Sequence, residues 1–258
     1  MKQIPNLFTL LNLIFGCIAI VYILQNGIVI FADSEGAQLV DVPEKLWMAS
    51  LFIGLAGVVD FLDGFVARIF KAHSEMGKQL DSLADLVSFG VAPGLILYQF
   101  LRLSFAKEEN GLDVSLLWLV PVFILPAAAA WRLAKFNLDP GQEFSFRGMP
   151  TPAIGLLVAS FPLIYFASHG SASQEWLTDL LLNKWFIYAV VLILSALMVS
   201  SLPLMSLKFK DYSFRNNLPK YLLAAIAIAS IIILQWLAVP VIIIAYVLVS
   251  LLFKNKAA

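Results

Sequence analysis

The chain has 258 residues, of which 61% are hydrophobic and only 13% are charged, and its formal net charge is zero. A soluble domain has roughly 25% charged residues, so this composition excludes an ordinary soluble protein. The single cysteine, Cys17, excludes an intrachain disulfide and a thiolate metal cluster, and we expect it to be a small buried side chain.

A helix needs ~20 apolar residues to cross a bilayer, and hydropathy predicts eight such spans along this chain. In order they are 8–25, 46–69, 78–101, 115–134, 151–168, 185–204, 218–236 and 238–253. The first run lacks a convincing cleavage site, so we expect it to be retained. The last two are separated only by the region around Pro240, which predicts a helical hairpin or a less regular pair. The predicted fold class is therefore an all-α polytopic membrane protein.

Lysine and arginine fall unevenly on the two sides of these spans. One side carries Lys2, Arg68, Lys71, Lys78, Arg132, Lys135, Arg147, Lys208, Lys210, Arg215, Lys220, Lys254 and Lys256, and the other carries Lys45, Arg102, Lys107 and Lys184. Cytoplasmic loops of membrane proteins are enriched in these residues. We therefore expect an inner-membrane protein with both termini in the cytoplasm, together with the 69–77, 135–150 and 205–217 loops.

Four aspartates interrupt the second and third spans near their predicted cytoplasmic ends. Asp60 and Asp63 are three residues apart, and Asp81 and Asp85 are four apart, so each pair shares one helical face. A short turn between the spans would place both pairs about 5–12 Å below it, at ~1.5 Å of rise per residue. Carboxylates gathered in a low-dielectric site repel one another unless a cation offsets their charge. We predict a site for Mg²⁺ or Mn²⁺, with two ions for charge balance, suited to phosphoryl transfer.

The residues between the aspartates fit a phosphate ligand. Gly64 and Ala67 share the acidic face, and Gly77 opens the next helix one turn before Asp81, so small side chains leave room there. Arg68 closes the same face at the rim, where a guanidinium can bind phosphate. A cation transporter that uses the aspartates as its ion site is the alternative from another class. Two observations count against a transporter: the sequence has no visible repeats, and Gly64, Ala67 and Arg68 lie beside the aspartates.

Together these residues spell D-x2-D-G-x2-A-R-x8-G-x3-D-x3-D, from Asp60 to Asp85. This pattern resembles the signature of the CDP-alcohol phosphatidyltransferase family. The resemblance implies a usually dimeric, six-helix transmembrane core over residues 1–204, to which a basic loop and a C-terminal helical pair are added at 205–258. It also implies transfer of a phosphatidyl group from a CDP-linked lipid to an alcohol, with release of CMP.

Carried over by position, the resemblance assigns roles to all eight signature residues. Divalent metal would be bound by Asp60, Asp63 and Asp81, with Asp85 also close to it. Asp85 would be the general base for the incoming hydroxyl. The cytidine nucleotide and its diphosphate would be contacted by Gly64, Ala67, Arg68 and Gly77.

Other stretches resemble the phosphatidylserine synthase branch of this family: PNLFTLLNLIFG at 5–16, RLAKFN at 132–137 and FRGMPTPAIG at 146–155. That resemblance implies CDP-diacylglycerol as donor and L-serine as acceptor, with a second copy of the chain as partner and no nucleic acid. The same chemistry with glycerol 3-phosphate, inositol phosphate or an ether-lipid donor stays open.

Further candidate residues lie outside the signature. Serine is a zwitterion, so its pocket should offer a cation to the carboxylate, and Arg132, Lys135 and Arg147 are candidates or else ordinary positive-inside anchors. Near the start of the first span, a helical stripe either faces the nucleotide or bonds between helices. The residues of this stripe are Asn6, Thr9 and Asn12.

Overall fold

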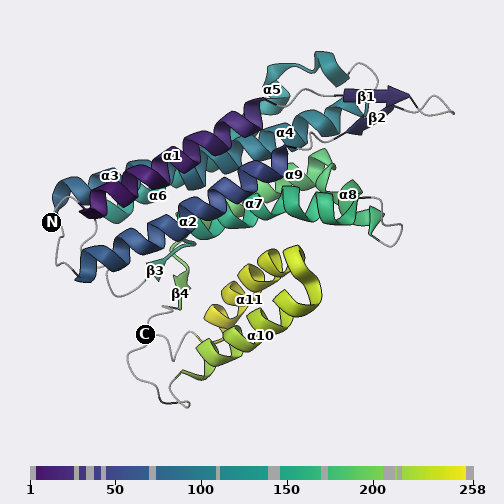
Figure 1. Ribbon diagram of the computed structural model, residues 1–258. Coiled ribbons are helices and arrows are strands. Elements are labelled where there is room, and N and C mark those ends of the chain that lie inside the picture. The colour runs from purple at the N-terminus through teal and green to yellow at the C-terminus, as the bar shows by residue number, and fades with distance from the viewer. Residues whose placement is uncertain are drawn as a thin grey trace.

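The computed structural model describes residues 4–25, 29–32, 38–41, 45–69, 74–108, 111–138, 146–169, 174–205, 213 and 217–253. Long helices lying side by side make up most of it (Figure 1). The main helices are α1 (Ile4–Leu24), α2 (Leu46–Ile69), α3 (Glu75–Asp85), α4 (Ala92–Ala106), α6 (Ile124–Leu138), α7 (Thr151–Ser168), α9 (Lys184–Val199), α10 (Leu218–Leu234) and α11 (Ala238–Leu252). Shorter helical elements are the π-helix η1 (Leu86–Val91), η2 (Gly111–Asp113), α5 (Leu116–Leu119), η3 (Val120–Phe123), α8 (Glu175–Leu181) and η5 (Gln235–Leu237).

The predicted all-α polytopic class is confirmed. Within the described ranges, six helical stretches are long and apolar enough to cross a membrane, and α8 with α9, bent by 66°, makes a seventh if the pair is one span. The last stretch, Leu218–Leu252, passes this test as one unit although the chain folds back within it. Its arms, α10 and α11, pack side by side as a hairpin (Figure 1). The length test therefore gives six or seven candidate spans in the described ranges, with this hairpin counted once, where the sequence predicted it as two of eight spans.

Two antiparallel ribbons interrupt the helices, and neither was expected. β1 (Val29–Ala32) pairs with β2 (Gln38–Asp41) between α1 and α2. β3 (Phe146–Arg147) pairs with β4 (Pro203–Leu204), so the predicted 185–204 span is wrong at its end, where α9 stops at Val199. Proline lacks a donor and disfavours helix at the residue before it, which ends the helical pattern here.

Two further sequence predictions concern Cys17 and the 205–217 loop. Cys17 is exposed on the surface of α1, not buried, because its face of the helix points away from the bundle. Of the predicted 205–217 loop, only Met205, Ser213 and Asn217 belong to the described residues.

The centre of the bundle is the π-helix η1, which directly follows Asp85 and packs against α1, α6 and α7. Two glycines let neighbouring helices approach it. A Cβ at Gly16 would lie 2.3 Å from Ser88 Oγ, and one at Gly155 would lie 2.8 Å from Phe89 Cα. Wide turns of this kind often occur at functional sites, because they redirect the side chains around them.

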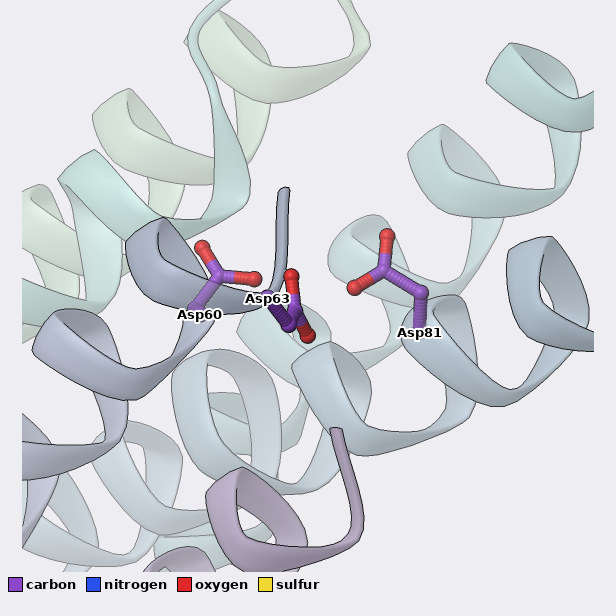
Figure 2. A group of neighbouring side chains, drawn as sticks. All are labelled: Asp60, Asp63 and Asp81. Atoms are coloured by element: carbon purple, nitrogen blue, oxygen red, sulfur yellow. The ribbon is translucent and has the colours of Figure 1, made fainter. Parts of the chain in front are cut away.

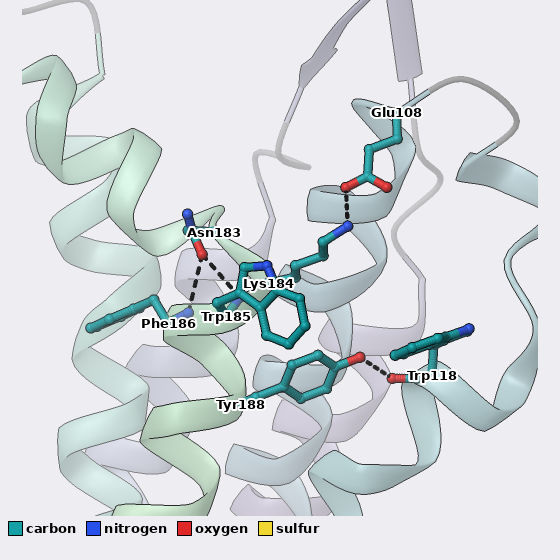
Figure 3. Close-up of polar contacts among 7 residues, drawn as sticks. All are labelled: Glu108, Trp118, Asn183, Lys184, Trp185, Phe186 and Tyr188. Atoms are coloured by element: carbon teal, nitrogen blue, oxygen red, sulfur yellow. Dashed lines mark hydrogen bonds and ion pairs between the residues drawn. The ribbon is translucent and has the colours of Figure 1, made fainter.

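At the other end of the bundle, polar contacts fasten the start of α9 (Figure 3). Asn183 caps the helix by accepting hydrogen bonds from the backbone N–H groups of Trp185 and Phe186, at 2.9 and 3.1 Å. Lys184 pairs with Glu108 after α4, and the Tyr188 hydroxyl donates to the carbonyl of Trp118 in α5. Tryptophan and tyrosine gathered at one level are typical of a membrane–water interface.

The tight contact at Gly16 makes a stability prediction. Gly16→Ala should cost about 1–3 kcal/mol, because the added methyl group would overlap Ser88 and push η1 away. Gly54→Ala is the matched control, since a Cβ there meets no atom within 4 Å, and it should be neutral or gain up to about 1 kcal/mol from helix propensity. Thermal unfolding in detergent measures both, and equal midpoints for the two variants would contradict this packing.

Candidate functional site

Three aspartates from two helices form the acidic cluster. Asp60 and Asp63 come from α2 and Asp81 from α3, and their side chains point toward one another (Figure 2). One carboxylate oxygen of each lies within 4.8 Å of the others. Asp63 is buried, and Asp60 and Asp81 are half-buried. The spacing of the acids in the sequence therefore did predict that they meet.

This cluster fits a divalent cation. Its ligand atoms are all carboxylate oxygens, which Mg²⁺ and Mn²⁺ favour. The ion pairs formed among the described residues, Lys107–Asp179 and Lys184–Glu108, lie elsewhere and leave the charge of the three aspartates unpaired by lysine or arginine. An ion held by these three side chains would offset their mutual repulsion and would draw phosphate oxygens to the same place.

Asp85 lies one turn deeper than Asp81 and outside the three-residue group. It is buried, with 7% of its surface exposed, and it accepts a hydrogen bond from Asn12 Nδ2 at 3.3 Å. Its carboxylate remains within electrostatic reach of Asp60, Asp63 and Asp81. The structure thus brings all four acids together but sets Asp85 apart in its surroundings, and the separate role expected for Asp85 stays a prediction.

Helix α1 packs against α2 and α3 and supplies the polar partners of both. The Thr9 hydroxyl donates to Asp63 Oδ2 at 2.9 Å, and Asn12 reaches Asp85 one turn further along α1. Ser88 of η1 donates to the carbonyl of Asn12 at 3.0 Å and fixes that turn. The Thr9–Asp63 bond joins two helices, and a contact of Thr9 with the nucleotide stays a prediction. Sequence reasoning missed Ser88, because no local pattern links it to α1.

The glycines and Arg68 border the cluster. A Cβ at Gly64 would meet nothing within 4 Å, so space is open beside the acids. The exposed Arg68 side chain folds back over this space, and its Nε donates to the Gly64 carbonyl at 3.0 Å. Gly77 has a different surrounding: a Cβ there would lie 3.1 Å from Asn6 Oδ1 and 3.0 Å from the capping Ser74 Oγ. The close packing of α1 on the start of α3 thus favours a glycine at position 77, because a larger side chain would have to displace these two atoms. Ala67 is half-buried on the same helix as Gly64.

On the opposite flank, Arg132 of α6 is buried, with 9% of its surface exposed. Its Nη1 donates to Thr151 Oγ1 at the start of α7, at 3.3 Å, and it lies within electrostatic reach of Asp85. Its Nε is buried and has no hydrogen-bond partner in the described part of the chain. Such a donor is costly to leave unpaired. Lys135 is exposed, and the side chain of Arg147 lies outside the described residues.

The bond between Thr9 and Asp63 predicts an effect on metal binding. Thr9→Val keeps the shape of the side chain but removes the donor that orients Asp63, so Mn²⁺ affinity should fall about tenfold to a hundredfold. Thr178→Val, whose hydroxyl bonds only within α8 among the contacts described, is the matched control and should bind as the wild type does. Electron paramagnetic resonance titration with Mn²⁺ measures both without turnover. Equal affinities for the two variants would contradict a metal site at Asp63.

Comparison with known proteins identifies the family of this chain. The family model described as CDP-alcohol phosphatidyltransferase matches residues 2–198. The chain is 34% identical over 261 residues to the CDP-diacylglycerol--serine O-phosphatidyltransferase of Mycobacterium tuberculosis (strain ATCC 25618 / H37Rv), which covers 95% of this chain and 76% of the relative. Proteins of the same name match from Bacillus subtilis (strain 168), with 33% identity over 64% of this chain and 78% of the relative, and from Saccharomyces cerevisiae, with 40% identity over 45% and 41%. The chain belongs to the CDP-alcohol phosphatidyltransferase family.

Proposed function

We propose that the protein transfers the phosphatidyl group of CDP-diacylglycerol to the hydroxyl of L-serine, giving phosphatidylserine and CMP. The observation that carries this proposal is the group of three aspartates within 4.8 Å, beside the buried Asp85, in a chain of this family. The names of the relatives support serine as the acceptor, and the relative from M. tuberculosis aligns with 95% of the chain.

The donor lies over the acidic cluster in this proposal. Asp60, Asp63 and Asp81 would hold Mg²⁺ or Mn²⁺, with Asp85 adjacent and two ions bound. The bound metal would neutralise the diphosphate and stabilise the leaving phosphate. Arg68 and the open surface at Gly64 receive the diphosphate from the rim, while Ala67, Gly77, Asn6 and Thr9 border the nucleotide.

The reaction is a direct displacement. The serine oxygen attacks the β-phosphorus as its proton passes to Asp85, which Asn12 holds in position. The bond from the β-phosphorus to the bridging oxygen breaks, and that oxygen leaves as part of CMP. The buried position of Asp85 suits this role because a base shielded from water is reserved for the acceptor.

The acceptor is bound on the Arg132 side. The guanidinium lies within electrostatic reach of Asp85, and its unpaired Nε would give a carboxylate a charge-assisted hydrogen bond near the base. This geometry favours Arg132 over the exposed Lys135 as the primary anchor, and Arg147 remains a further candidate. A phosphorylated acceptor, such as glycerol 3-phosphate or an inositol phosphate, would need more cations at this depth.

Orientation and assembly complete the proposal. The described cations Arg68, Lys78, Arg132, Lys135 and Lys220 belong to the predicted positive side, and the acidic cluster lies at that end of α2 and α3. The site would then open to the cytoplasm from the inner membrane, and the chain would act as a homodimer. Labelling of single cysteines in intact cells measures the orientation, and light scattering in detergent measures the assembly.

Turnover with defined substrates tests the function. Purified protein with Mn²⁺ and CDP-diacylglycerol should release CMP only when serine is present, among serine, glycerol 3-phosphate and inositol phosphate. CMP release with a different alcohol would support the same chemistry with another acceptor. Replacing CDP-diacylglycerol by an ether-linked CDP lipid measures the preference for the lipid backbone of the donor. Cation flux across sealed vesicles without CMP release would favour the transporter alternative.

Two acidic variants test the division of labour. Asp85→Asn should lower turnover by ~10²–10⁴, the usual worth of a general base, and leave the affinity for CDP-diacylglycerol near that of the wild type. Asp60→Asn should also weaken donor binding, because it removes a ligand of the metal. Initial rates of CMP release and equilibrium binding of the donor measure these effects. Equal loss of donor binding in both variants would contradict the assignment.

The acceptor assignment predicts a change in selectivity. Arg132→Lys keeps the charge but loses the planar fork, so the KM for serine should rise about tenfold to a hundredfold. The KM for CDP-diacylglycerol should change little, because the donor lies over the acidic cluster. Arg102→Lys is the matched control, because Arg102 lies on α4 and donates to Gln99 away from the acids. An equal rise of the KM for serine and for CDP-diacylglycerol would show that Arg132 does not bind the carboxylate.

A further inference from the structure

The C-terminal hairpin of α10 and α11 lies outside the part of the chain that the family model matches, residues 2–198. Its arm α11 contacts α7 and β4. Most of its surface is apolar and exposed, as expected for helices in lipid. Its polar contacts with the rest of the chain are therefore informative, and those that the structure describes for α11 lie on one face of that helix.

Tyr246 and Ser250 are four residues apart and share that face. The Tyr246 hydroxyl donates to the carbonyl of Met205 at 2.9 Å, and the Met205 N–H donates to Ser250 Oγ at 3.2 Å. Both backbone groups of Met205 are thus held by the hairpin. Met205 directly follows β4, so these bonds fix the position of that strand.

From β4 the connection continues to the acceptor side of the site. β4 pairs with β3, and the Gly148 and Met149 N–H groups donate to the carbonyls of Leu202 and Leu197, at 2.9 and 3.0 Å. Gly148 has a φ of 75°, a conformation that favours glycine. The segment leads within three residues to Thr151, whose hydroxyl accepts the hydrogen bond of Arg132.

The Tyr246 phenol is half-buried and lies within electrostatic reach of the Arg132 guanidinium. The hydrogen-bond partner of Arg132 is Thr151 on α7, and Asp85 and Tyr246 both lie within electrostatic reach of its charge. Thr151 and Tyr246 each present a hydroxyl group. A hydroxyl is neutral, so it can orient a guanidinium without cancelling its charge.

We infer that Tyr246 is a positioning residue for the acceptor: through Met205 and Arg132, the C-terminal hairpin holds the carboxylate-binding guanidinium in place. This inference rests on the proposed function. It assigns to the added helical pair a part in acceptor affinity, in contrast to donor binding, which belongs to α1, α2 and α3. The hairpin then contributes to substrate selection as well as to membrane anchoring.

The test compares two tyrosines that make the same kind of bond. In Tyr246→Phe, the KM for L-serine should rise about threefold to tenfold, the usual worth of one hydrogen bond, with the KM for CDP-diacylglycerol unchanged. Tyr188→Phe removes a hydroxyl that also donates to a backbone carbonyl, but at the other end of the bundle, and should change neither KM. CMP release by the purified full-length protein with Mn²⁺ gives these values, and thermal unfolding checks that both variants are folded.

A double variant separates positioning from a merely structural role. If Tyr246 acts through Arg132, Tyr246→Phe should have little further effect on the serine KM in an Arg132→Lys background. Additive effects, an unchanged serine KM in Tyr246→Phe, or an equal rise for donor and acceptor would each overturn the inference while serine-dependent CMP release by the wild type stands. Absence of that release from the wild type would overturn the proposed function and the inference with it.

Discussion

The structure depends on the electrostatic cost of placing carboxylates side by side in a membrane protein. Carboxylate oxygens of Asp60, Asp63 and Asp81 lie within 4.8 Å of one another, and Asp63 is buried while the other two are half-buried. Repulsion at such distances is strong in a low-dielectric site, and it must be offset by a cation and by oriented hydrogen-bond donors. The chain meets this requirement with open oxygen ligands on α2 and α3 and with neutral donors on α1. A lysine or arginine among the acids would have satisfied the charge but closed the site to metal.

Neutral donors and close packing keep this arrangement in place. Thr9 and Asn12 orient two of the acids without neutralising them. Gly16 allows α1 to approach Ser88, whose hydroxyl in turn holds the carbonyl of Asn12. The wide π turn of η1 follows Asp85 at once, so the helix that carries two of the acids changes its geometry where the site ends and the packed interior begins. The side chains that orient the acids and the contacts that pack α1 against η1 therefore depend on one another.

Much of this was predictable from the sequence, and the limits are physical. The bounds of α2 and α7 agree with the predicted spans 46–69 and 151–168, because charges or prolines border each apolar run. The meeting of the acids followed from helical spacing. In contrast, hydropathy extended the sixth span to residue 204, since it does not register that Pro203 and Leu204 pair with β3. The Thr9–Asp63 bond and the approach of Tyr246 to Arg132 join residues far apart in the chain, and no local pattern encodes either.

Helix α1 has a consequence for how the enzyme can be regulated or inhibited. Its Thr9 and Asn12, one turn apart, donate hydrogen bonds to Asp63 of the acidic cluster and to Asp85 respectively. A single axial slide or rotation of this helix would disturb both halves of the reaction together. Its outer face carries the exposed Leu7, Ile14 and Val21 and is open to the surrounding bilayer. A change of bilayer thickness that shifted α1 would therefore reach the Thr9–Asp63 and Asn12–Asp85 contacts together.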